Sequence, residues 1–491
     1  MSETYQSGTS NLDALKKAIE DAASLSGGLW FSYLFVLLYF AVAAGAVTHV
    51  DLFMENSVKL PFMNIELPLK AFFLLAPLLF IVTHAYILAH FVLLAEKTNL
   101  FYKELPSQIK DAQTAEAKNT RNIFGSQLPS NVFVQFLVGL GDLGEGKFGY
   151  LLKTIAWTTL VFAPILLLLL LQIQFLPYHD PGITWIQRIV LLADLLLIGW
   201  LWTWILSLRN KPSAGLPVSL WGGRLVGFAS GLAVLLFSWM VATFPGEWQK
   251  PPLSWVAFLE PISIQKKIFY SRGSTSTANR DKHLSNILIL SEFNIYEALK
   301  IDNPKKVEWR NVLYSVQNRD LKGAIFDRAT LQKVVFDDAQ LQGANFDYAH
   351  LQGASLKYAK LQGMSSTKAE LQGVSFDGAN LQGAALNFAK LYFASLNGAK
   401  LQGASLDFAE LHGASLEGAR SQLGPFDEST QLQGASMKYA HLEGASLRGA
   451  NMAALQISGA YVWRTSFLKY DIDKKSGKCL LAPESLPTPS G

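Results

Sequence analysis

Two ionisable side chains fall inside long apolar stretches of the sequence. His84 lies within an apolar run at 71–95, and Asp194 lies within another at 186–208. A titratable group in a bilayer is costly, so such residues commonly mark ion or proton pathways. A His–Asp pair could relay protons, or it could hold helices together through a hydrogen bond. His90, in the same run as His84, is open to the same two interpretations.

A glycine motif offers a second candidate site. Residues 139–144 read G-L-G-D-L-G and match the G-x-G-x-x-G pattern of dinucleotide-binding loops. Such a site also needs a following helix, a second strand and an acidic residue about 20 positions on. The chain instead enters an apolar run at 154–176, so we interpret the motif as a hinge at a membrane surface. No catalytic, cofactor or metal-ligand spacing stands out elsewhere, and the sequence predicts no enzyme.

The apolar runs predict a helical membrane domain. Half of the 491 residues are hydrophobic and 16% are charged. A helix needs about 20 apolar residues to cross a bilayer, and five runs reach that length: 29–50, 71–95, 154–176, 186–208 and 225–244. Lys and Arg concentrate before the first run, within 96–153 and after the fourth run, which predicts a cytoplasmic amino-terminal tail at 1–28 and a cytoplasmic loop at 96–153.

The stretch at 253–264 decides on which side of the membrane the remaining chain lies. It is apolar but short for a span, and Glu260 and Pro261 interrupt it. We interpret it as interfacial, which places everything after the fifth span outside the cytoplasm. A sixth crossing there would return the chain to the cytoplasm.

A period of five residues dominates 319–468. A large apolar residue recurs at every fifth position with a small residue two before it, as in Ala344-Asn345-Phe346. On an α-helix these apolar side chains would spiral around the axis, and on a flat strand they would alternate between faces. Only a chain that turns between repeats points them all inward, which predicts a solenoid. Glycine follows many of them by two, where a corner needs permissive backbone angles.

This pattern resembles the pentapeptide repeat family. The resemblance implies a right-handed quadrilateral β-helix with about 20 residues per coil. Residues 130–244 also resemble the membrane portion of a group of bacterial proteins of that family. The expected fold class is therefore an α-helical transmembrane bundle plus an all-β right-handed quadrilateral β-helix, in a bacterial inner membrane.

The segments around the repeats have their own expectations. The connector at 245–318 should cover the open end of the solenoid with residues 284–318. The tail at 469–491 is expected to be disordered. One extra residue within 427–431 shifts the register and predicts a bulge, and Ser366 and Ser421 occupy positions that should be apolar.

Residues that lie 20 apart should stack in columns. One column would hold Gln342, Gln362, Gln382, Gln402 and Gln422, and another would hold Tyr348, Lys368, Phe388 and Phe408. An exposed aromatic stripe can bind a partner. Stacked side chains can equally serve to stabilise neighbouring strands.

Charge and composition narrow the function. Some members of the family mimic DNA, which requires a strongly acidic rod. Basic and acidic residues are nearly balanced here and the whole chain carries +4, so we expect no nucleic-acid partner. The single Cys479 excludes an internal disulfide.

We expect a membrane-anchored scaffold or interaction module that sits in the lipid bilayer and presents a rigid β-helix to an unknown protein partner. The alternative is a small-solute or proton transporter that uses Asp194 and His84, with the β-helix as an accessory domain.

Overall fold

The computed structural model describes residues 3–60, 65–108, 151, 154–202, 204, 220–241, 286–303, 312–417, 430–447, 450, 452 and 454–465. The chain forms two compact units. The first contains Met1–Asp51, Glu55–Phe175 and Pro181–Ala242, and the second contains Leu52–Met54, Leu176–Asp180 and Thr243–Gly491. The glycine motif at 139–144, the stretch at 253–264 and the tail at 469–491 lie outside the described residues.

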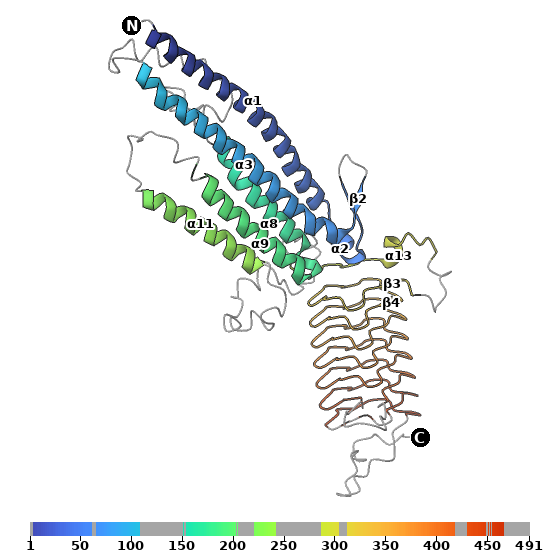
Figure 1. Cartoon of the computed structure of the whole chain (residues 1–491). Helices are drawn as coiled ribbons and strands as arrows, with labels where there is room; N and C mark the ends of the chain where they lie inside the picture. The colour runs from blue at the N-terminus through green and yellow to red at the C-terminus, as the bar shows by residue number, and fades with distance from the viewer. Residues whose placement is uncertain are drawn as a thin grey trace, which may run out of the picture. The chain divides into compact units, whose positions relative to one another are not determined.

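The first unit is built from long helices (Figure 1). They are α1 (Glu3–Gly45), α3 (Leu69–Gln108), α8 (Ala163–Phe175), α9 (Pro181–Leu197) and α11 (Leu220–Val241). Helix α3 packs against α1, α8 and α9, while α11 packs against α9. Large side chains such as Phe72 and Phe80 fill the interior, and others such as Phe31 and Leu79 are exposed. Helices that are apolar on all sides suit a lipid environment.

The lengths of the helices agree with membrane insertion. Four described stretches are long and apolar enough to cross a bilayer: Asp13–Gly45, Leu69–Phe101, Thr154–Tyr178 and Pro181–Leu201. The apolar part of α11, Gly227–Val241, is shorter, so the fifth predicted span stays a prediction. Helix α1 already begins at Glu3, which makes most of the predicted tail at 1–28 helical.

Short elements interrupt and connect the long helices. A π-helical turn, η1 (Thr158–Phe162), leads into α8, and a second, η3 (Ile198–Trp202), follows α9. Between α1 and α3 lie the short helix α2 (His49–Met54) and an antiparallel pair of strands, β1 (Val58–Lys59) and β2 (Glu66–Leu67). The 3-10 turn η2 (Leu176–Tyr178) joins α8 to α9. A π turn displaces backbone carbonyls from their regular partners and frees them for other bonds.

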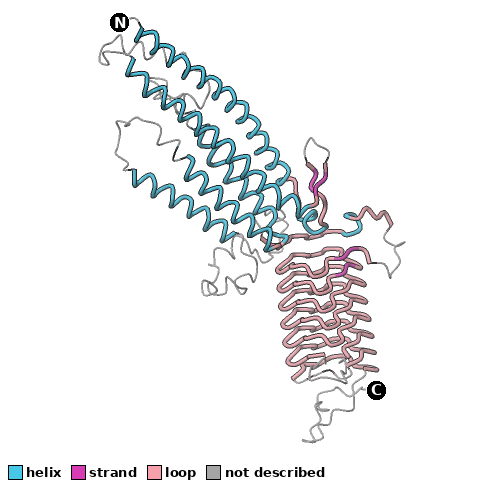
Figure 2. Tube along the Cα trace, in the orientation of Figure 1, coloured by secondary structure: helices cyan, strands magenta, loops and turns pink. Residues whose placement is uncertain are grey.

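The second unit is a solenoid of stacked coils (Figure 2). Parallel bridges join residues one coil apart, such as Asp320 to Gln340 and Gln340 to Lys360. The inward residues of each pentad are buried: Leu341 and Ala344 are 0% exposed, and Phe326 and Phe346 stack with ring centroids 4.9 Å apart. The period of five therefore produces the apolar interior that the sequence predicts.

Each pentad turns at a residue with a positive φ angle. The third residue of the turn adopts a left-handed conformation, as at Gly343 (φ 68) and Gly373 (φ 65). The next alanine closes the turn, for example through the 3.0 Å bond from the Ala344 amide to the Leu341 carbonyl. Glycine suits this corner because it lacks a Cβ.

The segment before the repeats is itself a coil. Ile289 pairs with Ile325, Asn294 pairs with Thr330, and strand β3 (Tyr314–Ser315) pairs in parallel with β4 (Val334–Val335). The short helix α13 (Ile295–Ala298) lies within this coil. The segment at 284–318, which the sequence suggested as a cover, therefore extends the β-helix in its described part.

Two distant segments close the open end of this coil. Phe53, from Leu52–Met54, packs its ring against Phe293, Tyr314 and Phe326 at centroid distances of 5.6, 5.8 and 5.8 Å. His179, from Leu176–Asp180, lies 2.6 Å from the Asn286 carbonyl through Nε2 and 3.2 Å from the Asp320 carbonyl through Nδ1. The Phe53 ring thus covers apolar side chains at the end of the solenoid, and the two His179 contacts engage backbone carbonyls there.

One coil is longer than the others. The bridges change from a spacing of 20 to 31 at Lys400–Gln431, and Ser405–Ser436, Glu410–His441 and Ser415–Ser446 keep the longer spacing. Eleven residues are thus added, because 31 exceeds 20 by 11. The sequence-based expectation of one extra residue was wrong. The eleven added residues equal two pentads plus one residue, and they shift the register of the five-residue pattern by the same amount as a single residue would. Ser421 and Gln422 lie outside the described residues.

Candidate functional site

A buried His–Asp pair joins two helices of the first unit. His84 on α3 and Asp194 on α9 lie 2.6 Å apart, from Nδ1 to Oδ1, and both side chains are 0% exposed. The second ring nitrogen of His84 lies 3.2 Å from the carbonyl oxygen of Leu160 in η1. The sequence pointed to these two side chains, and the structure brings them together with a third helical segment.

The two hydrogen-bond partners of His84 restrict which of its ring nitrogens carry a proton. The Leu160 carbonyl can only accept a hydrogen bond, so Nε2 donates to it. Nδ1 then either donates to an ionised Asp194 or accepts a bond from a protonated one. In both cases one proton is shared across the 2.6 Å contact and the pair is neutral overall. A neutral pair avoids the large cost of an isolated charge in an apolar interior.

Aromatic side chains enclose the pair. Tyr33 of α1 stacks on His84 with centroids 5.7 Å apart, and Phe80 stacks at 5.9 Å. The Tyr33 hydroxyl donates to the Thr159 carbonyl at 3.1 Å. Both carbonyl acceptors, of Thr159 and Leu160, belong to the π turn η1, where the regular helical pairing is shifted. The sequence gives no sign of this turn, so these partners could not be predicted.

One oxygen of the pair has no bond. Asp194 Oδ2 is buried and accepts no hydrogen bond from any described residue. His90, the other histidine of this helix, packs its ring against Tyr86 at 4.6 Å. The pair can therefore tie α3, α9 and η1 together, and it also has a free acceptor that could take a proton.

The predicted aromatic column forms a continuous ladder in the second unit. Phe388 stacks on Phe408 at 4.9 Å, and Phe408 stacks on Tyr439 at 5.0 Å. The Lys368 ammonium lies 5.5 Å from the Tyr348 ring and 5.9 Å from the Phe388 ring, which links the upper and lower parts. Arg328 extends the ladder above Tyr348 at 5.6 Å. Tyr439 was not predicted as a member of this column, because the insert places it 31 residues after Phe408 instead of 20.

The aromatic residues of the ladder have positive backbone φ angles, which bulky residues rarely adopt. Tyr348, Phe388 and Phe408 occupy the corner position with φ values of 58, 59 and 60. A left-handed conformation costs a bulky L-residue about 1–2 kcal/mol, and an aromatic pair contributes about 0.5–1.5 kcal/mol. Stacking thus offsets the corner strain. The ring faces are covered by their neighbours, while 43–47% of each of these residues stays exposed.

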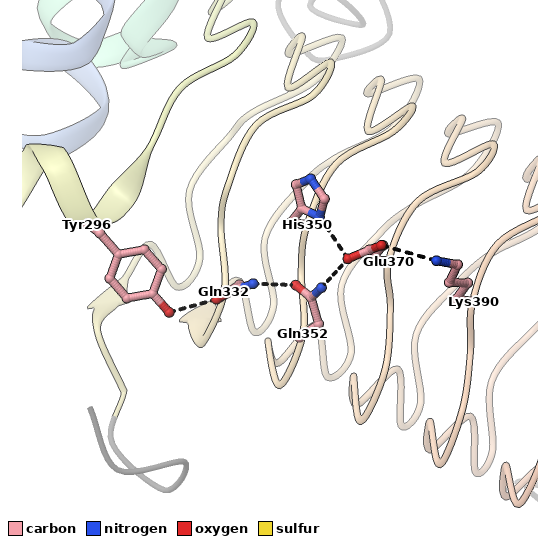
Figure 3. A network of polar contacts seen from close by, with 6 residues as sticks. All are labelled: Tyr296, Gln332, His350, Gln352, Glu370 and Lys390. Carbon is pink, nitrogen blue, oxygen red and sulfur yellow. Dashed lines mark hydrogen bonds and ion pairs between the residues drawn. The ribbon is translucent and has the colours of Figure 1, made fainter. Parts of the chain in front are cut away.

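The glutamine column is only partly bonded. Gln382 donates to Gln402 at 3.2 Å, whereas the Oε1 atoms of Gln342 and Gln362 are buried with no hydrogen bond from the described residues. A more complete network runs along another column (Figure 3). It passes from Tyr296 through Gln332, Gln352 and Glu370 to His350 and Lys390.

The carboxylate of Glu370 is the centre of this network. It accepts from Gln352 at 2.5 Å and contacts His350 at 2.9 Å and Lys390 at 3.2 Å. Burial alone would raise the pKa of Glu370, but the hydrogen bonds and charges of His350 and Lys390 lower it overall. The spacing of 20 between His350, Glu370 and Lys390 is the signal in the sequence that could have revealed it.

The comparisons with known proteins address the solenoid. The family described as pentapeptide repeats matches with 8 copies, at residues 317–347, 335–365, 349–387, 384–420 and 428–463. This part of the chain is a pentapeptide repeat domain. The predicted β-helix is confirmed for this domain by the family match and by the parallel bridges between its coils. Comparison with curated proteins finds no match.

Several solved structures resemble the pentapeptide repeat domain. HetL from the cyanobacterium Nostoc, involved in heterocyst differentiation regulation, is 24% identical, with 36% of this chain and 86% of that chain covered and a TM-score of 0.18. QnrB1, a plasmid-mediated fluoroquinolone resistance protein, is 15% identical over 37% and 92%, with a TM-score of 0.18. A thylakoid lumen protein of Arabidopsis thaliana is 29% identical over 22% and 69%, with a TM-score of 0.13.

Proposed function

We infer that this protein is a membrane-anchored scaffold that presents its pentapeptide repeat domain to a protein partner. The proposal rests on which chain segments make up the second unit. It takes in Leu52–Met54 and Leu176–Asp180, which in sequence lie between membrane helices, as well as the chain after α11. The repeat domain is therefore covalently connected to the helices through three chain segments instead of a single linker.

The same three segments support a location outside the cytoplasm. They follow the first, third and fifth predicted spans, so a chain that crosses the membrane at each span brings all three to one face. That face is opposite the amino terminus, which the distribution of Lys and Arg assigns to the cytoplasm. A sixth crossing at 253–264 would separate the repeats from the two segments that complete their first coil.

Sidedness can be tested with the lone Cys479. A membrane-impermeant maleimide should label the protein in intact cells to the same extent as in permeabilised cells. Labelling that requires permeabilisation would contradict the extracytoplasmic location.

The walls of the β-helix are the surface proposed for the partner. A rigid, flat wall with aromatic edges buries apolar area without ordering loops, which favours protein association. The ladder of Tyr348, Phe388 and Phe408 supplies such edges. In the glutamine column, Gln382 and Gln402 supply accessible amide groups for a polar rim, whereas Gln342 and Gln362 have buried Oε1 atoms.

Site-specific photo-cross-linking in membranes tests this wall. A photoreactive residue at Phe388 should give one discrete adduct of defined mass. The matched control is Tyr358, which is 65% exposed but lies in a different column. Equal cross-linking at both positions, or none at Phe388, would contradict a partner on the ladder.

Proton movement is a second candidate function, favoured by the Oδ2 of Asp194, which accepts no hydrogen bond from the part of the chain that the structure describes. Purified protein in liposomes loaded with a pH-sensitive dye provides the test. Movement that is lost in Asp194→Asn but kept in Ser238→Ala, which changes another buried polar contact, would support transport. A wild-type protein that moves no protons would leave the pair with a purely structural role.

A further inference from the structure

Two histidines and a glutamate converge on one wall of the pentapeptide repeat domain. The ligand atoms of His412, His441 and Glu443 all lie within 4.8 Å of one another. His441 Nδ1 is 3.1 Å from Glu443 Oε1, and His412 Nε2 is 3.3 Å from Glu443 Oε2. No metal-ligand spacing is visible in the sequence here, because the insert separates His412 from Glu443 by 31 residues instead of 20.

The fold holds these side chains in place. Leu411 and Leu442 point into the core with 0% and 1% exposure. Their neighbours therefore point outward, because successive side chains of an extended segment alternate between faces. The backbone bridge between Glu410 and His441 fixes the height of the two coils. Such a constraint limits the freedom that the three side chains would lose on binding.

Neighbouring rings orient both imidazoles. His412 and His441 stack with centroids 5.3 Å apart and an angle of 18° between their planes. Tyr461 stacks on His441 at 4.4 Å, and Tyr392 packs on His412 at 5.2 Å. The imidazoles are thus held side by side above one carboxylate, with 38% of each histidine side chain exposed.

The hydrogen bonding of the cluster is incomplete. His412 Nε2 lies 3.3 Å from Glu443 Oε2 without forming a hydrogen bond. This buried oxygen has no hydrogen-bond donor among the described residues. Ligand atoms around one first-row metal ion, each about 2.0–2.2 Å from it, lie about 3.0–3.5 Å apart. The two nitrogen-to-oxygen distances, one to each oxygen of Glu443, already fall in that range. Ligand atoms that lie farther apart, up to 4.8 Å, would move closer together on binding.

We propose that His412, His441 and Glu443 bind a divalent transition-metal ion of the Zn²⁺ class. Two imidazoles and a carboxylate suit Zn²⁺ and its first-row neighbours, whereas Mg²⁺ and Ca²⁺ prefer all-oxygen sites. Three protein ligands leave a coordination position for water or for a group from a binding partner. The site joins two successive coils next to the insert, so a bound ion would cross-link them.

The test measures Zn²⁺ binding to the full-length protein in detergent, purified with a tag that contains no histidine. Wild type should bind one Zn²⁺ at this site, and Zn²⁺ should raise its unfolding temperature. The double variant His412→Gln, His441→Gln should lose affinity at least about tenfold, since even weaker perturbations of metal sites cost that much. It should also lose the thermal shift.

The matched control is His350→Gln. His350 lies in the same column as His441 and contacts Glu370 at 2.9 Å, but no second histidine joins them. This variant should bind Zn²⁺ as wild type does. If the double variant fails to fold, Glu443→Gln replaces it, because the amide keeps the shape of the carboxylate. Absence of Zn²⁺ binding in wild type, or equal binding by the substituted cluster, would overturn the proposal.

Discussion

Arg319 donates a 2.7 Å hydrogen bond to the carbonyl oxygen of Phe53, which lies 266 residues earlier in the chain. Its second terminal nitrogen bonds the Leu52 carbonyl at 3.1 Å, and its guanidinium lies 4.5 Å from the Tyr178 ring. One side chain of the first repeat coil thus holds both of the distant segments that complete the solenoid end. Carbonyls at the end of a short helix are natural acceptors for an arginine.

Removal of the Phe53 ring should destabilise the first coil. Phe53 is 0% exposed and touches three aromatic rings. Loss of such a ring costs about 3–5 kcal/mol. Phe53→Ala should therefore make the repeat domain more sensitive to protease and lower its unfolding temperature. Val312→Ala, at a residue 59% exposed, is the control and should change neither. Equal protease resistance of the two variants would refute the role of Phe53.

Two adjacent serines should respond in opposite directions. Ser366 is 0% exposed and its hydroxyl has no hydrogen bond among the described residues, so Ser366→Ala should raise stability by about 1 kcal/mol. Ser365 donates to Asp347 at 2.5 Å, so Ser365→Ala should lower stability by about 1.5–3 kcal/mol. Denaturant unfolding of the two variants measures both. A loss of stability in Ser366→Ala would contradict the prediction and show that this hydroxyl has a partner in solution, and a gain in Ser365→Ala would contradict the role of its bond to Asp347.

Two glycines at equivalent corners should differ in tolerance. Both Gly373 and Gly378 have positive φ, but an added Cβ at Gly378 would lie 2.5 Å from the Tyr358 ring, whereas nothing lies within 4 Å at Gly373. Gly373→Ala should cost about 1–2 kcal/mol from backbone strain, and Gly378→Ala should cost more. Adding Tyr358→Ala should reduce the excess. A double-mutant cycle on unfolding free energies measures this coupling, and additive costs would rule out the clash.

Asp320 should make the repeat domain sensitive to acid. Burial alone would raise its pKa, but the contacts with His179 and Lys322 hold it well below the usual range. A lowered pKa in the folded state adds stability above the ordinary value of about 4. This stability is lost as the pH falls below that value toward the folded-state pKa. Protease resistance should therefore decline from about pH 5 to pH 3, and Asp320→Asn should flatten the decline while lowering resistance at pH 7.

The five-residue periodicity was sufficient to predict the solenoid, because each pentad contributes its own inward-facing residues to the core. Leu341, Ala344 and Phe346 are buried by residues one coil away, and the spacing of 20 follows from the repeat itself. The length of the insert was not predictable, because 11 residues and one residue leave the same phase. The closing segments around Phe53 and His179 carry no repeat signal, so nothing in the sequence ties them to the β-helix.

The candidate sites likewise combine residues that the sequence reveals with partners that only the structure reveals. An ionisable residue in an apolar run, such as His84 or Asp194, is visible in the sequence. The Leu160 carbonyl that fixes the protons of His84 becomes available through a π turn, which has no signature in residue types. The cluster of His412, His441 and Glu443 depends on the insert, which only the pairing of backbones reveals.

The longer coil has a consequence for how this rod could change during evolution. A deletion of five residues elsewhere would rotate every later wall by one face, and the aromatic ladder would break at that point. After the insert, the bridges from Gln431 to Ser446 still meet their partners in phase. An insertion at this position therefore leaves the surface pattern aligned, which makes it a suitable place to introduce an epitope or a second domain.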